Sequence, residues 1–168
     1  MKQRERQPLN ELALGSFSKA IAGLLLTEWP EFRASLRMEQ AGDLDGLSIV
    51  LDLESPTGDP TRFLELWVEP RAEGPDLSIG FGPSHTHACC QSDRESAILA
   101  MLRAILSDEI VIIEGVGGPY PGNRLWLDLR EPDALADALT HRWSPDRVLV
   151  KSWSGKRDRE VSLDDLSL

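Results

Sequence analysis

Four apolar-rich segments in the first half of the chain are joined by short polar loops, and this spacing constrains the fold more than any other feature. The segments are 33–39, 47–53, 62–69 and 77–81. Apolar residues recur at alternate positions within them, weakly in the first, as is typical of strands with one buried face. Loops of about four to eight residues are too short for helical crossovers. We therefore expect consecutive strands to pair as an antiparallel meander.

Three other segments have helical periodicity. The first is predicted near 17–28, where apolar residues follow the spacing of one buried helix face before a proline ends the run. The second is predicted over about 93–106, where Ser92 and Glu95 form a capping box at its start. The third, near 132–140, has proline in its first turn and acidic residues at its positive end. We expect these helices to cover one face of the sheet.

The second half of the chain adds two predicted hairpins. The apolar run 110–113 is typical of a central strand covered on both faces, and a long loop joins it to the strand 125–129. Further on, 147–153 and 156–163 are predicted strands around Ser154-Gly155, a two-residue turn that suits a hairpin.

These elements predict an α+β fold, with a mainly antiparallel twisted sheet of about six to eight strands packed by two or three helices. A length of 168 residues favours a single domain over 1–168. Residues 1–8 are charged and lack apolar periodicity, so we expect that segment to be disordered.

The charge is strongly negative and unevenly distributed. The formal net charge is −10, and residues 1–37 carry six basic and four acidic residues, so residues 38–168 carry the other 12 basic and 24 acidic ones. An acidic body repels nucleic acid and anionic membranes and is compatible with a basic protein partner. The alternative is that the acidity serves only solubility.

The chain shows no membrane-spanning segment and no disulfide pattern. The longest apolar candidate, 20–26, is far shorter than the roughly 18 to 20 residues that a bilayer requires, and the next residues, Thr27-Glu-Trp-Pro30, do not resemble a signal-peptide cleavage site. Cys89 and Cys90 are adjacent, and neighbouring side chains of a strand point to opposite faces, which disfavours a bond between them. These features predict a cytoplasmic protein.

Two histidines and a cysteine alternate in the segment after Phe81. On a strand, His85, His87 and Cys89 would share one face and could offer three ligands to zinc. Zinc would need a fourth ligand, and His141 is the only other histidine. Packed histidines are the most ordinary interpretation, and a binding surface without metal is the next. We therefore predict neither a metal site nor a cofactor.

Catalytic motifs are lacking elsewhere in the sequence. The glycine-rich loop 115–122 contains two prolines and is followed by a strand instead of a helix, which favours an extended hairpin loop with Tyr120 exposed over a phosphate site. No nucleophile elbow and no His-Glu-x-x-His motif is present. We expect a protein that is not an enzyme, with a small enzyme or metal-binding protein using the His85/His87/Cys89 strand as the alternative.

Acidic residues line the predicted meander. They surround Trp67 and comprise Asp43, Asp45, Asp52, Glu54, Glu65 and Glu69. A solvated face is the simpler interpretation. The more specific one is a recognition surface for a basic partner, with an aromatic anchor among carboxylates.

The order of several motifs resembles small uncharacterised bacterial proteins grouped with immunity proteins of polymorphic toxin systems. The motifs are a strand ending in Gly-Phe-Gly, the His85-x-His87 step, a helix ending at Leu106, the strand 110–113, and the segment Ser152-Trp-Ser-Gly-Lys-Arg-Asp158. The resemblance covers roughly residues 77–160. It implies a single acidic domain that binds and blocks a toxin, without catalytic residues.

We therefore predict a non-enzymatic acidic protein that binds a basic partner, for which a toxin is the candidate that the resemblance implies. The matched positions of the resemblance are His85, His87, Trp153, Gly155 and Asp158. Together with the acidic face and the glycine-rich loop, they give the predicted binding residues Asp52, Glu65, Trp67, Glu69, His85, His87, Tyr120, Trp153 and Asp158.

Overall fold

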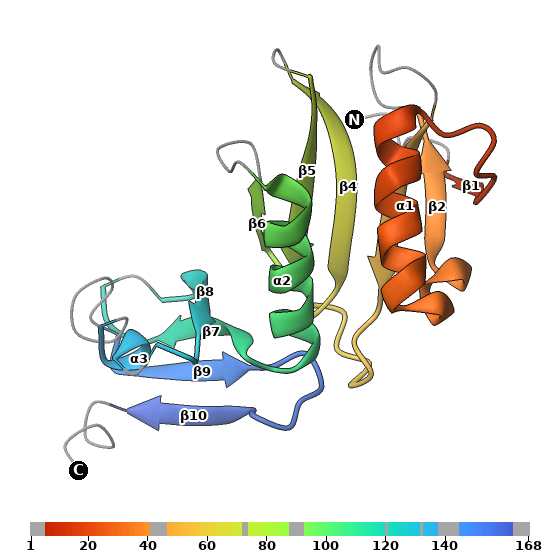
Figure 1. Ribbon diagram of the computed structural model, residues 1–168. Coiled ribbons are helices and arrows are strands. Elements are labelled where there is room, and N and C mark those ends of the chain that lie inside the picture. The colour runs from red at the N-terminus through yellow and green to blue at the C-terminus, as the bar shows by residue number, and fades with distance from the viewer. Residues whose placement is uncertain are drawn as a thin grey trace. The chain divides into compact units, whose positions relative to one another are not determined.

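The chain adopts an α+β fold with two antiparallel sheets (Figure 1). The computed structural model describes residues 6–40, 47–71, 74–87, 93–119, 121–131, 133–137 and 145–162. In these residues the sheets have six and four strands, accompanied by three α-helices. No helix among them is both long and apolar enough to cross a membrane. The predicted fold class is confirmed, and the strands divide between two sheets.

The chain groups into two compact units, each built from three separate segments. Unit 1 comprises Met1–Glu54, Phe63–Gly80 and His85–Ala100, and unit 2 comprises Ser55–Arg62, Phe81–Ser84 and Met101–Leu168. Because the segments alternate along the sequence, no single cut separates the units.

The six-stranded sheet of unit 1 is a meander whose strands follow one another in sequence order, as predicted. Its strands are β1 (Gln7–Pro8), β2 (Leu36–Glu39), β3 (Ser48–Leu53), β4 (Leu64–Arg71), β5 (Gly74–Phe81) and β6 (Ser84–His87). Gln7 and Pro8 lie within the segment for which the sequence predicts disorder, yet they pair with β2, opposite Met38 and Arg37.

One face of this sheet is apolar and buried. Leu36 pairs with Leu51, and Leu51 pairs with Leu66, so one residue from each of three adjacent strands forms a row with no exposed surface. Helix α1 (Ser16–Glu28) packs against β3 and buries Ile21 and Leu25. The predicted first helix and the predicted apolar face of the meander are therefore confirmed.

The start of β2 differs from the sequence pattern, whereas the second helix agrees with it. The predicted strand 33–39 starts only at Leu36, because a 3₁₀ helix, η1 (Pro30–Ala34), precedes it. Proline at its first position and the buried Phe32, which stacks on Trp29 at 5.3 Å between ring centroids, favour this turn. Helix α2 (Arg94–Leu106) matches the prediction, and the predicted capping residue at position 92 lies outside the described residues.

Unit 2 contains the four-stranded sheet, in the order β10-β9-β7-β8. Its strands are β7 (Ile110–Val116), β8 (Arg124–Asp128), β9 (Arg147–Lys151) and β10 (Arg159–Ser162), and the short helix α3 (Ala134–Asp137) contacts β8. Val111 and Ile113 of β7 join a core cluster with strands β8, β9 and β10, while Ile110 and Ile112 are buried on the other face. The prediction of a central strand covered on both faces is confirmed.

The hairpin of β9 and β10 has a longer connection than the sequence suggested. Ser154-Gly155 lies in it, as predicted, but the strands are separated by the whole segment 152–158. Gly155 has a φ of +79°, and a Cβ there would lie 2.9 Å from Thr57 Cγ2, so both the backbone conformation and the close approach favour glycine.

The buried leucine row generates a stability prediction. Replacing the fully buried Leu66 by alanine should lower the free energy of unfolding by about 2–5 kcal/mol, because it removes apolar contacts and leaves a cavity. Urea denaturation monitored by circular dichroism measures this change. Leu12, which is 90% exposed, is the matched control, and Leu12→Ala should change the value by less than about 0.5 kcal/mol. Equal effects of the two substitutions would contradict the assigned register.

Candidate functional site

The other face of the six-stranded sheet carries polar and aromatic side chains. Strand pairing sets Glu39 opposite Ser48, Val50 opposite Trp67, and Asp52 opposite Glu65. Alternation along the strands places these six residues on the side away from the leucine row. We call this surface, together with the side chains that extend it, Arg6, Ser78, His85 and His87, the polar face.

Arg6 joins three carboxylates of the polar face. Its Nη1 lies 2.5 Å from Asp52 Oδ2, its Nη2 lies 3.3 Å from Glu65 Oε1, and its Nε lies 3.8 Å from Glu39 Oε2. The three acids come from the adjacent strands β2, β3 and β4. Like charges directly opposite each other, such as Asp52 and Glu65, destabilise a sheet, so the guanidinium offsets their repulsion.

The pKa values of Arg6 and Glu65 are both raised. Burial opposes the charged form of Arg6, but the nearby carboxylates, Asp52 first, raise its pKa above the ordinary value. Burial raises the pKa of the Glu65 carboxyl; the hydrogen bond from Arg6 opposes this shift, and the charge of Asp52 adds to it. One guanidinium therefore serves carboxylates from three strands.

Within the described part of the chain, Ser48 Oγ and Asp52 Oδ1 of β3 are buried on this face without a hydrogen-bond partner. Ser48 has no exposed surface, and neither its Oγ nor Asp52 Oδ1 has a partner among the residues that the structure describes. Ser48 lies opposite Glu39, and Asp52 lies on the same face further along the same strand. Buried polar atoms usually find a partner, because leaving them without one costs about 1–3 kcal/mol. Among the described residues, these two oxygens are therefore acceptors to which Arg6 donates no hydrogen bond.

Aromatic side chains continue the polar face toward β6. The rings of Trp67 and His85 are 5.9 Å apart, and those of His85 and His87 are 5.1 Å apart at an interplanar angle of 79°. His87 Nδ1 lies 2.6 Å from the hydroxyl oxygen of the buried Ser78 on β5. Trp67 is only partly buried and His85 is exposed, so both offer surface beside the carboxylates.

The histidine strand forms no recognisable metal centre in the part of the chain that the structure describes. Within those residues, no group of three or more histidine, cysteine, aspartate or glutamate side chains is placed to hold a metal ion. Cys89 and Cys90 lie outside the described residues, so the alternative of a metal or enzyme site on His85, His87 and Cys89 stays a prediction.

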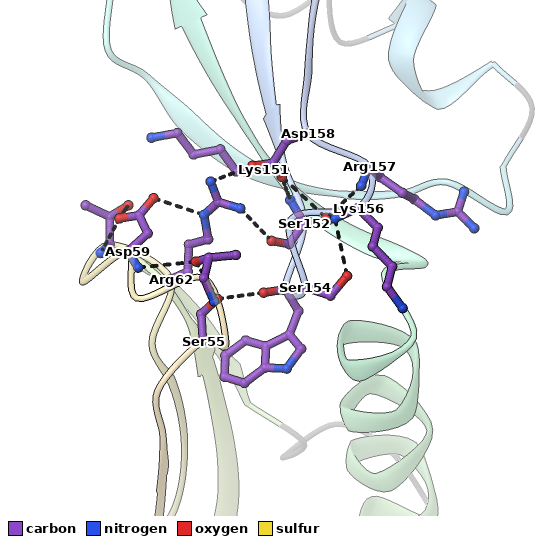
Figure 2. A network of polar contacts seen from close by, with 12 residues as sticks. Ser55, Asp59, Arg62, Lys151, Ser152, Ser154, Lys156, Arg157 and Asp158 are labelled. Carbon is purple, nitrogen blue, oxygen red and sulfur yellow. Dashed lines mark hydrogen bonds and ion pairs between the residues drawn. The ribbon is translucent and has the colours of Figure 1, made fainter.

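A second polar cluster lies in unit 2, around the buried side chain of Arg62 (Figure 2). Arg62 Nε donates to Asp59 Oδ2 at 2.9 Å, Nη1 donates to the carbonyl of Ser152 at 3.0 Å, and Nη2 lies 2.6 Å from Asp158 Oδ2. The other oxygen of Asp158 accepts from the amide of Ser152 at 2.9 Å. Arg62 thereby ties the loop before β4 to the segment 152–158.

Further hydrogen bonds hold the same segment from its other side. The Ser55 hydroxyl donates to the carbonyl of Trp153 at 2.6 Å, and the amide and hydroxyl of Ser154 both donate to the buried Asp108 carboxylate. Asp108 follows α2 with a φ of +59°, a left-handed conformation that aspartate tolerates better than most residues. The segment 152–158 is therefore held both by the loop before β4 and by the turn after α2.

The structure distributes the predicted binding residues over these two places. Asp52, Glu65, Trp67, His85 and His87 lie on the polar face. Trp153 and Asp158 belong to the Arg62 cluster, where Trp153 is buried with its ring edge-on to Phe81, at 6.1 Å between ring centroids, and Asp158 is an ion-pair partner. The backbone of Glu69 lies in β4, but its side chain and the whole of Tyr120 are outside the described residues.

The sequence did not indicate the residues that organise the polar face and the Arg62 cluster. Arg6 lies in a segment for which the sequence predicts disorder, and Glu39 belongs only to the polar side of a weakly alternating strand. Asp59 lies in a predicted loop and Arg62 at the start of a predicted strand. The one sequence feature that indicates their ion pair is the i, i+3 spacing of opposite charges. No sequence pattern connects them to Asp158, which is 96 positions further on than Arg62.

The Arg62 cluster gives a prediction for acid stability. Hydrogen bonds from the hydroxyl and amide of Thr61, and then the Arg62 guanidinium, lower the pKa of Asp59 from 3.8 to about 2. A lowered folded-state pKa contributes stability that is present above the unfolded value and lost as the pH falls through the folded value. At one pKa unit per 1.36 kcal/mol the shift corresponds to about 2 kcal/mol, and solvent screening of this partly exposed carboxylate reduces the contribution at neutral pH to about 1 kcal/mol.

Asp59→Asn should therefore reduce the free energy of unfolding by about 1 kcal/mol at neutral pH, and the difference in this free energy between variant and wild type should shrink as the pH falls from about 4 to about 2. Chemical denaturation over this pH range measures both quantities. Asp133→Asn, which removes an exposed carboxylate, is the control and should have little effect at any pH. A difference for Asp59→Asn that is independent of pH would refute the electrostatic explanation.

Comparison with known proteins identifies no relative of this chain. No family model, no curated protein sequence and no solved structure matches it. The resemblance to immunity proteins therefore stays an expectation from the sequence.

Proposed function

We propose that this chain is a non-enzymatic binding protein that holds a basic protein on the polar face of its six-stranded sheet. The observation that carries this proposal is the convergence of Glu39, Asp52 and Glu65 on the single guanidinium of Arg6. Carboxylates from three adjacent strands already bind one arginine side chain there, which makes the surface suited to a cationic partner.

The charge of the whole chain supports the same partner class. A net charge of −10 attracts cationic proteins over distance, and such steering raises association rates by roughly 10- to 1000-fold at low salt. Affinity also requires an anchor that loses its contact with water on binding. Trp67 suits this role, because it is partly exposed, sits opposite Val50 and lies two positions from Glu65.

The finer proposal is that the partner is a basic toxin which this chain binds and blocks. It is supported by the sequence resemblance to immunity proteins and by the acidity of the chain. A blocking protein needs a preformed surface with complementary charge and no catalytic group of its own. The polar face suits this requirement, since its carboxylates are set by paired strands instead of loops.

Charge reversal on the polar face tests the proposal. The double variant Asp52→Lys/Glu65→Lys should bind the basic partner captured from host-cell extract at least about 10-fold more weakly than the wild type, because it converts two attractive contacts into repulsive ones. Surface plasmon resonance should show the loss mainly in the association rate, and the wild-type rate should fall as salt is raised.

The control for position is Glu31→Lys, which reverses one exposed carboxylate of η1 in the same unit and changes the net charge by half as much. It should change the affinity by less than about 2-fold, since it leaves the polar face intact. Trp67→Ala should instead accelerate dissociation. A captured partner that binds the Asp52/Glu65 double variant as well as the wild type would rule out the polar face as the contact surface.

A further inference from the structure

Arg6 is held to the polar face by a weak attachment. β1 consists of two exposed residues, Gln7 and Pro8, and the proline has no amide hydrogen to donate to β2. The Arg6 side chain itself is 42% exposed. Apart from its ion pairs with the three carboxylates, lifting Arg6 away would therefore disturb only the short pairing of β1 with β2.

The contacts of Arg6 also fit the site imperfectly. Charge-assisted hydrogen bonds between a guanidinium and a carboxylate are typically about 2.7–2.9 Å long. Arg6 reaches Asp52 at 2.5 Å, but it stays 3.3 Å from Glu65 and 3.8 Å from Glu39, which is 8% exposed. Its position is limited by the pairing of the next two residues with β2. A guanidinium that is free of this restraint can approach the three acids more evenly.

The two buried oxygens that have no partner among the described residues indicate a ligand that donates hydrogen bonds. Ser48 is fully buried on the polar face opposite Glu39, and its hydroxyl lacks a partner among the described residues, as does Asp52 Oδ1. The ligand that satisfies a carboxylate oxygen is a hydrogen-bond donor. An arginine side chain offers five N–H donors in a planar fork, whereas lysine offers three on a single ammonium nitrogen.

We propose that Arg6 is the chain's own occupant of an arginine-binding site formed by Glu39, Asp52 and Glu65, beside the buried Ser48, and that an arginine of the basic partner takes its place on binding. This inference rests on the proposed function and adds the regulation of its site. Arg6 keeps the carboxylates paired in the free protein and competes with the partner. The apparent Kd for the partner is therefore the intrinsic Kd divided by the fraction of molecules in which Arg6 has left the site.

Binding of a fluorescent nona-arginine peptide, measured by fluorescence anisotropy with the full chain, tests this competition. Arg6→Ala should bind the peptide about 5- to 10-fold more tightly than the wild type, because the competing occupant is gone. Arg6→Lys keeps the net charge but loses the planar fork, and it should bind the arginine peptide about 2- to 3-fold more tightly. A nona-lysine peptide should gain less in both variants.

The matched control is Arg33→Ala. Arg33 is an exposed arginine of unit 1 paired with Glu11 at 3.0 Å, so its removal changes the net charge by the same amount without opening the site. It should strengthen peptide binding by less than about 2-fold. Equal gains for Arg6→Ala and Arg33→Ala, or no gain for Arg6→Lys, would overturn the proposal, because the effect would then be one of net charge alone.

Two further measurements keep the outcomes distinct. Thermal unfolding monitored by circular dichroism shows whether each variant is folded at the temperature of the binding experiment. If Arg6→Ala is unfolded there, the peptide affinity of Arg6→Lys tests the competition instead. The double variant Asp52→Asn/Glu65→Gln should bind the nona-arginine peptide more weakly than the wild-type chain does. If that variant binds normally, the proposed function fails; if it binds weakly while the Arg6 variants show no gain, only the competition fails.

Discussion

The alternation of side chains along the strands of unit 1 is the constraint on which the rest of that unit depends. Because the strands pair in the observed register, Leu36, Leu51 and Leu66 form one buried row, and Asp52 and Glu65 meet on the opposite side. A shift of one residue would move the leucines into water and the carboxylates into the core. The burial that stabilises the sheet therefore also fixes the geometry of the acidic surface.

Two arginines illustrate how the same chemistry serves different purposes. Arg62 is 10% exposed and is bound by two carboxylates and a backbone carbonyl, so its removal would leave partly buried charges without a partner. Arg6 is 42% exposed and directly precedes a strand of two residues. The first arginine is fixed as a structural tie, whereas the second is held loosely enough to be exchanged. The two arginines therefore differ more in how deeply their side chains are buried than in how many carboxylates they contact.

Much of the fold can be predicted from the sequence, because short-range patterns specify it. The apolar alternation of 47–53, the helical spacing of 93–106 and the continuous run 110–113 each correspond to an observed element. The predicted start of β2 is wrong because proline and the packing of Phe32 on Trp29 stabilise a 3₁₀ turn over the residues before it. The division into two sheets is not foreseeable, since alternation shows which face is buried but not which strands pair.

The candidate sites are predicted less completely, because their central contacts join residues distant in sequence. Asp52, Glu65 and Trp67 can be found from their positions on neighbouring strands. Arg6 contacts Asp52 across 46 positions, and no periodicity relates an arginine before β1 to a carboxylate in β3. The same holds for Arg62 and Asp158, which meet only because the turn 152–158 folds back on the loop before β4.

The most direct test of the polar face as a binding surface is chemical footprinting of carboxylates, read by mass spectrometry, with and without the basic partner. The proposed contact predicts that binding protects Asp52 and Glu65 from modification, while the exposed Glu31 and Glu160 react equally in both samples. Unchanged labelling of Asp52 and Glu65 in a saturated complex would contradict the account, because the partner would then bind elsewhere on the chain.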